Sequence, residues 1–269
     1  MKKAVIGDCT LYCGDSLSLI REGIIPVVDH AIFDPPYEEE IHNANKKLSG
    51  RKLRKDGGNE FTDFGFDSIA GIREDVVVLL APLVQKWFIS FCTIEGTHLW
   101  AQAINASPMK YKRPCVWVKP DATPQLNGLG PAIGAECFVC AWGGKGYSEW
   151  NAGGKRGVYT HNVNPPSRIN KNDGGHPTEK PVSLMKEIIL DFTKEGQVIF
   201  DPFMGSGTTG VACVQLRRKF IGIELQEKYF DLSCRRIEEA QRLADNQADL
   251  FISSPKYKNQ RFKFEGAEK

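Results

Sequence analysis

The segment from Gln197 to Leu225 constrains the fold more than any other part of the chain. An apolar strand at 197–201 leads into a glycine-rich turn, a helix at 206–217 and a second apolar strand at 219–225. Strands and helices that alternate in this way build mostly parallel sheets with helices on both faces. The segment therefore predicts an α/β fold with a doubly wound, mostly parallel sheet.

The rest of the chain repeats this alternation. We expect further strands at 10–15, 29–34, 86–92, 113–120 and 135–142, and further helices at 16–22, 72–85, 95–106, from 181 onward and at 227–244. Pro82 is expected to bend the helix at 72–85. Residues 143–176 are rich in glycine and asparagine, and residues 38–71 predict a mobile basic loop. We divide the chain into a catalytic domain at 1–245 and a basic, aromatic tail at 246–269.

The composition excludes several classes of protein. Hydrophobic residues make up 41% and charged residues 25% of the 269 residues, as in an ordinary globular protein. The N-terminus has no apolar run like that of a signal peptide, and no stretch reaches the ~20 apolar residues of a membrane helix. We therefore expect a cytoplasmic protein without a membrane partner.

The eight cysteines predict neither a metal site nor a disulfide framework. Cys137 and Cys140 form a CxxC pair, but no second pair of ligands follows at the spacing of a zinc site. Positions i and i+3 of a strand also face opposite sides of the sheet. These cysteines are expected to pack in the core.

The glycine-rich turn predicts a nucleotide-like cofactor. Gly205, Gly207 and Gly210 match the pattern GxGxxG between a strand and a helix, where glycines let a ligand approach the backbone closely. Glu224 ends the next strand, where a carboxylate can accept hydrogen bonds from ribose hydroxyls. These residues alone leave NAD and S-adenosylmethionine open. Only residues 225–269 follow, so the sheet must be completed by strands from the N-terminal half, in a circularly permuted order.

The sequence DPPY at 34–37 ends another apolar strand. Two prolines restrict the backbone after Asp34 and remove two N–H donors, so the Pro35 carbonyl is expected to face the site. Tyr37 adds a flat ring for stacking. An acidic acceptor, a carbonyl acceptor and a ring, without an obvious nucleophile, suit an exocyclic amino group on a planar base. Ligands of open α/β sheets bind at the carboxyl ends of strands, so Asp34 and Asp201 are expected to share one crevice.

Three motifs together resemble a known family. DPPY at 34–37, HPTEKP at 176–181 and DPFMGSGTTG at 201–210 occur in the order typical of beta-group, amino-methylating DNA methyltransferases. The resemblance extends from about Asp15 to Arg242. It implies a Rossmann-like methyltransferase fold in circularly permuted motif order, S-adenosyl-L-methionine as cofactor and double-stranded DNA as partner. A homodimer is compatible with it.

The resemblance also assigns site residues. Asp34, Pro35, Pro36 and Tyr37 would form the catalytic pocket. The residues implied to bind the cofactor lie in the motifs and at strand ends: Asp15, Ser16, Thr178, Lys180, Asp201, Phe203, Gly205, Gly207, Thr208 and Glu224. Among them, Glu224 would hold the ribose, Asp15 the adenine, and Thr178 and Lys180 the methionine end. An ordinary helix cap is the alternative for Asp15 and Ser16.

The expected reaction is direct methyl transfer to a base that has left the helix. In this family an aspartate in the first position of the motif favours adenine N6, whereas cytosine-N4 enzymes more often carry serine. The region expected to recognise the target sequence, 143–176, is short for a separate domain. Two alternatives follow: base readout comes instead from the basic loop at 38–71, or sequence specificity is low.

Two basic stretches suit contacts with nucleic acid. Residues 46–55 contain Lys46, Lys47, Arg51, Lys52, Arg54 and Lys55. Residues 255–264 interleave basic and aromatic side chains, which suit phosphate contacts and base stacking. The net charge of +2 carries no such signal by itself.

Several alternatives stay open at this point. The same chemistry could act on cytosine N4, on RNA or on a protein glutamine. A nicotinamide-dependent oxidoreductase would explain the glycine-rich turn and Glu224 but leaves DPPY unexplained. A catalytically silent DNA-binding protein with a relic fold is a further alternative. The residues do not separate an enzyme of a restriction-modification system from a solitary or phage-borne one.

Overall fold

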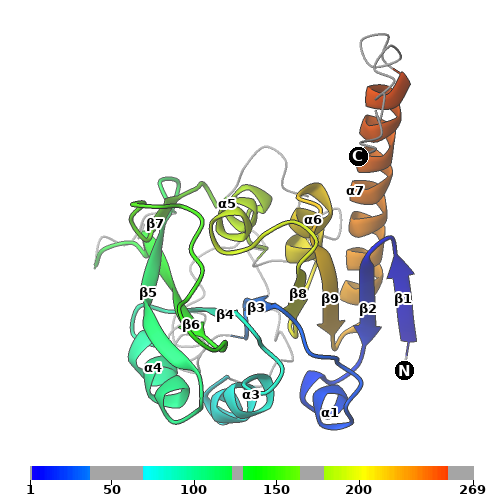
Figure 1. Cartoon of the computed structure of the whole chain (residues 1–269). Coiled ribbons are helices and arrows are strands. Elements are labelled where there is room, and N and C mark those ends of the chain that lie inside the picture. The colour runs from blue at the N-terminus through cyan, green and yellow to red at the C-terminus, as the bar shows by residue number, and fades with distance from the viewer. Residues whose placement is uncertain (1, 37–68, 123–129, 164–178, 254–269) are drawn as a thin grey trace, which may run out of the picture.

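A nine-stranded sheet forms the centre of the molecule (Figure 1). The computed structural model describes residues 2–36, 69–122, 130–163 and 179–253. The strands of this sheet are β1 (Lys2–Ile6), β2 (Cys9–Cys13), β3 (His30–Phe33), β4 (Trp87–Cys92), β5 (Lys110–Val118), β6 (Ala135–Trp142), β7 (Val158–Thr160), β8 (Val198–Asp201) and β9 (Lys219–Glu224). Their spatial order is β1-β2-β9-β8-β3-β4-β6-β5-β7.

Most strands of the sheet point the same way. β2, β9, β8, β3 and β4 pair in parallel. β6 runs antiparallel to both β4 and β5, so β5 and its parallel neighbour β7 share the direction of the first five. Only β1 and β6 run the other way in this sheet. The predicted doubly wound, mostly parallel sheet is therefore confirmed, and most strands end at one edge, here called the carboxyl edge.

Helices cover both faces of the sheet (Figure 1). One face carries α1 (Ser16–Arg21), α3 (Arg73–Leu80) and α4 (Thr97–Asn105), and the other carries α5 (Val182–Phe192), α6 (Thr208–Gln215) and α7 (Glu227–Ser253). A short 3₁₀ turn, η1 (Ile69–Gly71), precedes α3. Each face has its own apolar cluster. Burial of both clusters supplies the main driving force for folding.

The CxxC pair lies in the core, as predicted. Cys137 belongs to one apolar cluster and Cys140 to the other, so the two side chains face opposite sides of β6. All eight cysteines are free thiols. The described part of the chain also contains no group of three or more His, Cys, Asp or Glu side chains arranged for a metal ion.

Four features differ from the sequence-based expectations. β1 and β7 were not predicted, because β1 is a largely exposed edge strand and β7 has three residues within a glycine-rich stretch. α3 ends at Leu80, before Pro82, so the proline follows the helix instead of bending it. α7 continues past Ala244 to Ser253 and therefore crosses the division placed at residue 245, which stays a prediction. Among the described helices, none is both long and apolar enough to cross a membrane.

Candidate active site

Three acidic residues meet at the carboxyl edge of the sheet. β3, β8 and β9 are neighbours, and Asp34, Asp201 and Glu224 lie at or just after their ends. The chain order would separate these strands widely, but the topology places them side by side (Figure 1). The predicted shared crevice for Asp34 and Asp201 therefore agrees with the fold.

The glycine-rich turn is folded around Glu224. The backbone N–H groups of Gly205 and Gln226 donate to the two carboxylate oxygens of Glu224 at 3.0 and 2.8 Å. Gly205 and Gly207 have φ values of +52° and +80°, which favour glycine. A Cβ on Gly207 would lie 2.8 Å from Cβ of Ser233 on α7. These glycines permit both the turn and its close packing against α7.

Asp201 stabilises the same turn from inside. Its Oδ1 accepts from the Phe203 N–H at 3.0 Å and its Oδ2 from the Thr209 hydroxyl at 2.7 Å. The side chain is 2% exposed, and burial raises its pKa to about 7. Both oxygens are occupied within the protein, so the structure shows Asp201 supporting the loop. Direct contact with a cofactor stays a prediction.

Asp15 and Ser16 connect α1 to this turn. Asp15 caps α1, since its Oδ1 accepts from the Ser18 N–H at 2.8 Å, which is the helix-cap arrangement considered as the alternative. The Ser16 hydroxyl donates to the carbonyl of Pro202, and the Gly14 N–H donates to the Glu224 carbonyl at 3.0 Å. These bonds fix the start of α1 beside the glycine-rich turn.

Phe203 and Thr208 complete the predicted loop residues. The ring of Phe203 packs against that of Phe33, with 5.9 Å between the two ring centroids. This contact joins the loop to the core. Thr208, the first residue of α6, is buried.

Arg236 on α7 was not found by sequence reasoning. Its Nη1 donates to the carbonyl and hydroxyl oxygens of Ser206, each at 2.8 Å, and its Nη2 donates to Oε1 of Glu179. Arg236 thus joins the glycine-rich turn to the HPTEKP motif. Within the described part of the chain, Oε2 of Glu179 is buried and has no hydrogen-bond partner. In the sequence, an arginine on this long amphipathic helix looks the same as an arginine on the exposed face, so the sequence alone does not indicate its role.

Lys180 contacts the catalytic motif directly. Its Nζ lies 2.6 Å from Oδ2 of Asp34 and 3.3 Å from Oε2 of Glu136. The sequence placed Lys180 near the methionine end of the cofactor, and that role stays a prediction. The structure adds a contact with the predicted catalytic carboxylate.

Asp34 is held in an environment that opposes its charge. Burial raises the pKa of Asp34, and the neighbouring Lys180 ammonium limits the rise. The Oδ1 atom of Asp34 is buried and has no hydrogen-bond partner among the residues that the structure describes. A buried carboxylate oxygen is costly without a donor, so this atom is suited to receive an N–H group from a ligand.

Glu136 is a second site residue that sequence reasoning missed. It lies on β6 and contacts Lys119, which directly follows β5, as well as Lys180. Burial raises the pKa of Glu136, but Lys180 and Lys119 outweigh this effect and hold its pKa below the ordinary value. The available signal was a single acidic residue within the apolar strand AECFVCAW.

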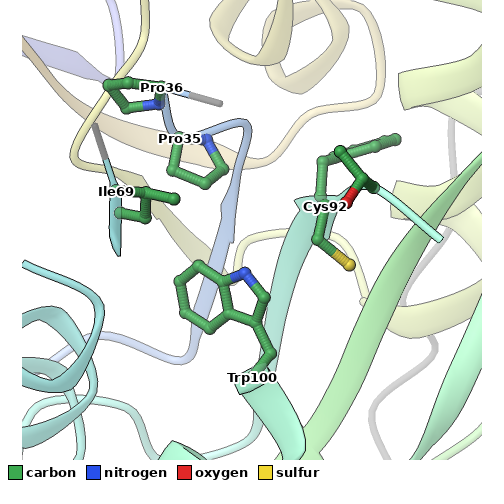
Figure 2. Close-up of a pocket in the computed structure, with 7 residues that line it drawn as sticks. Pro35, Pro36, Ile69, Cys92 and Trp100 are labelled. Atoms are coloured by element: carbon green, nitrogen blue, oxygen red, sulfur yellow. The ribbon is translucent and has the colours of Figure 1, made fainter. Parts of the chain in front are cut away.

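An apolar hollow lies beside DPPY. Figure 2 shows Pro35, Pro36, Ile69, Cys92 and Trp100 around it. Its empty volume, which includes space open to solvent, is about 180 Å³. These side chains provide apolar surface suited to a flat ring.

Some predicted site residues lie outside the described part of the chain. They are Tyr37, Thr178, Lys46, Lys47, Arg51, Lys52, Arg54 and Lys55. Their roles stay predictions. The structure brings together Asp34, Lys180, Asp201 and Glu224 at one edge of the sheet.

The fold and the site define a methyltransferase-like α/β protein, and comparison with known proteins identifies its family. Residues 28–235 match the model of the DNA methylase family. The match covers more than half of the chain, so the protein belongs to this family of N6- and N4-directed DNA methylases. The predicted family and enzyme class are confirmed.

Individual relatives agree with this assignment. The type II methyltransferase M2.MboI of Moraxella bovis is 47% identical over 261 residues, which cover 88% of this chain and 90% of that protein. The DNA adenine methyltransferase YhdJ of Escherichia coli (strain K12) is 36% identical over 265 residues, 86% of this chain and 83% of that protein. The M1.HpyAVI–SAM complex superposes with a TM-score of 0.63 at 26% identity, covering 85% of this chain and 98% of that one. These similarities also confirm the predicted fold class.

Proposed function

We propose that this protein is a site-specific DNA adenine-N6 methyltransferase. The observation that carries the proposal is the buried, unpartnered Oδ1 of Asp34, at the end of a strand next to the one that leads into the glycine-rich turn. An exocyclic amino group supplies the N–H donor that this oxygen lacks. The glycine-rich turn provides a place for the methyl donor on the neighbouring strand.

Adenine is preferred over cytosine on two grounds. The motif begins with Asp34 rather than serine, and aspartate is the residue that the family resemblance associates with adenine N6. The relative YhdJ is named a DNA adenine methyltransferase. Cytosine N4 is the second candidate, because the same family includes N4-directed enzymes.

S-adenosyl-L-methionine is the proposed methyl donor. The residues fit this molecule, because Gly205 and Gly207 adopt the positive φ angles of the glycine-rich turn and Glu224 presents a carboxylate at the end of β9. The neighbour M1.HpyAVI is a complex with SAM. When bound, the donor supplies a methyl group: the amino nitrogen forms the N–C bond, the C–S bond breaks with its electron pair passing to sulfur, and the nitrogen releases a proton.

The chain's own residues orient the amino group and stabilise its charge. Asp34 accepts an N–H of the target amino group and stabilises the positive charge that develops on its nitrogen. The Pro35 carbonyl is the proposed second acceptor, and Tyr37 the stacking partner. Positioning of this kind supplies much of the rate enhancement in such reactions. A base inside a duplex cannot reach these groups, so it must leave the stack at a cost of a few kcal/mol.

Double-stranded DNA is the proposed partner. The basic residues at 46–55 and the basic, aromatic tail suit phosphate contacts and stacking. The loop at 38–71 and the segment at 143–176 are the proposed regions of sequence readout. A homodimer, a cytoplasmic location and a restriction-modification context are compatible with the family and stay predictions.

One experiment tests reaction, base and substrate class together. Purified protein is incubated with methyl-labelled S-adenosylmethionine and unmethylated duplex DNA, and the digested nucleosides are identified by mass spectrometry. Label in N6-methyladenine supports the proposal. Label in N4-methylcytosine overturns the base assignment, and label only in a parallel RNA or protein reaction overturns the substrate class.

A further inference from the structure

The Lys180 ammonium lies between two carboxylates. Its Nζ is 2.6 Å from Oδ2 of Asp34 and 3.3 Å from Oε2 of Glu136. It also lies over the rings of Phe91 and Trp117, at 5.2 and 5.9 Å from their centroids. The side chain is 6% exposed. An ammonium removed from water in this way needs an opposite charge beside it, and here it has two.

Glu136 joins this ammonium to a second one. The Lys119 ammonium contacts Oε1 of Glu136 and lies 4.7 Å from the ring centroid of Trp117. Among the described residues, the cluster contains two carboxylates, Asp34 and Glu136, and two ammonium groups, Lys119 and Lys180. Because Glu136 already lies 3.3 Å from Lys180, the ammonium can leave Asp34 and still have a carboxylate within reach.

Methyl transfer favours a shift of Lys180 from Asp34 toward Glu136. Positive charge develops on the amino nitrogen that binds Oδ1 of Asp34, and the Lys180 ammonium, 2.6 Å from Oδ2 of the same carboxylate, repels that charge and draws on the negative charge that stabilises it. Before the base arrives the contact is useful, since burial raises the pKa of Asp34 and Lys180 favours the ionised carboxylate. The Lys180 ammonium therefore stabilises the Asp34 carboxylate before the base binds, and disfavours the charge on the amino nitrogen during methyl transfer.

We propose that Glu136 is a positioning residue for methyl transfer, whose carboxylate receives the Lys180 ammonium when the amino group of the target base binds Asp34. This inference rests on the proposed function, because it concerns the same amino group. Glu136 does not touch the base in this account. It acts through the position of Lys180.

Glu136→Gln removes the second carboxylate and keeps the side-chain shape. Single-turnover methylation of duplex DNA, at saturating DNA and cofactor, is expected to slow by about tenfold, within the range for coupled charged residues. Glu149→Gln is the matched control, since Glu149 binds Lys86 and Lys194 at the opposite edge of the sheet. Its rate is expected to change by less than about twofold, as for a surface ion pair. A wild-type rate in Glu136→Gln overturns the inference.

The pH profile separates positioning from a general loss of structure. The charged groups facing Asp34 are Lys180, Glu136, Lys119 and the neighbouring Asp201. The negative charge of Glu136 raises the pKa of Asp34. Its removal is therefore expected to move the acid limb of the single-turnover rate to lower pH, as the rate itself falls. An unmoved acid limb argues for a structural role.

A charge-neutral double variant tests the exchange itself. Lys119→Met with Glu136→Gln keeps the net charge of the cluster and still leaves Lys180 without its second carboxylate. The single-turnover methylation rate of this double variant is expected to stay below that of the wild type. If Glu136→Gln alone fails to fold, the double variant provides the test in its place. Recovery of the wild-type rate would mean that net charge, not the second carboxylate, sets the rate, and overturns the inference.

A further comparison asks whether Glu136 acts through Lys180. In a Lys180→Met background, Glu136→Gln is expected to change the remaining rate by less than about twofold, because residues that act as a unit are not additive. An equal loss in both backgrounds overturns the inference. If the wild-type protein methylates no DNA amino group, the proposed function fails; if it does and Glu136→Gln matches it, only this inference fails.

Discussion

Lys180 Nζ lies 2.6 Å from Asp34 Oδ2, although 146 positions separate the two residues in the chain. The contact joins the HPTEKP and DPPY motifs at the carboxyl edge of the sheet. It shows that the two motifs form one charged centre. The chemistry of that centre depends on how the Asp34 carboxylate is shared.

Asp34→Asn is expected to reduce turnover by about 100-fold or more, since the neutral amide no longer stabilises the charge on the amino nitrogen. Cofactor affinity is expected to stay within a few-fold, because the glycine-rich turn does not use Asp34. Methylation rates and titration calorimetry with S-adenosylmethionine measure the two effects. Asp34→Ala is likewise expected to abolish turnover while cofactor affinity stays within a few-fold. Retained turnover would remove Asp34 from the mechanism.

Glu224→Ala is expected to weaken cofactor binding by about tenfold to 100-fold, or about 1.4–2.8 kcal/mol. The change removes the proposed ribose acceptor, the hydrogen bond from the Gly205 N–H of the turn, and a local hydrogen bond from the Gln226 N–H. Calorimetry provides the measurement. Glu22→Ala is the control, because Glu22 is an exposed residue at the end of α1. Equal affinities for the two variants would contradict the assignment of Glu224.

Asp201 predicts a pH-dependent stability. Burial raises its folded-state pKa to about 7, above its ordinary value, so the folded protein binds the extra proton between these two values. The free energy of unfolding therefore falls as pH rises through this window, by up to about 1.4 kcal/mol per unit. Asp201→Asn is expected to flatten the dependence. Melting temperatures between pH 5 and 8 test this, and parallel curves for both proteins would refute it.

Arg236→Met is expected to lower stability by about 3–5 kcal/mol, because it leaves the buried Glu179 carboxylate without its cation. It also removes the bonds to Ser206, so affinity for the cofactor should fall. In the Arg236→Met background, Glu179→Gln is expected to restore part of the stability but not the affinity for the cofactor. Denaturant unfolding measures the stability, and calorimetry measures the cofactor affinity. Full recovery of both would show that Arg236 does not order the turn.

The basic segment predicts a salt-dependent interaction with DNA. Neutralising Arg51, Lys52, Arg54 and Lys55 together is expected to weaken binding and to flatten the dependence of log K on log salt. The slope should fall by about 0.9 for each phosphate that these side chains neutralise in the wild type. Binding isotherms at several salt concentrations measure this slope.

A control for that experiment lies at the edge of the sheet where the parallel strands begin. Lys194→Gln with Lys219→Gln removes positive charge near the starts of β8 and β9. Its salt dependence is expected to match that of the wild type. Unchanged affinity of the four-residue variant at low salt would exclude the segment at 46–55 as a DNA-binding region.

The sequence was most informative where local chemistry dictates backbone shape. Gly205 and Gly207 marked the turn because their backbone conformation excludes most other residues. Apolar runs marked the buried strands, which have few alternatives once both faces are covered. The position of Glu224 followed from the end of such a run. These features are local, so a single sequence reveals them.

Contacts between distant segments were not predictable in the same way. Glu136 and Arg236 lie in elements with ordinary patterns, and their roles arise only when the sheet brings β6 beside β4 and α7 beside α6. Asp201 was assigned to the cofactor, but its partners, Phe203 and Thr209, belong to its own loop. Hydrogen-bond partners depend on the folded geometry, which spacing alone does not give.

The shared direction of the strands also determines how the protein can be handled. Asp34, Asp201 and Glu224 lie at the ends of their strands, whereas Lys219 and the loop around Lys194 lie where strands begin. Lys194 and Lys219 are exposed. A fluorophore or a surface tether attached there leaves the carboxyl edge open to a long nucleic acid. Immobilised molecules could then be observed one at a time while they act on DNA.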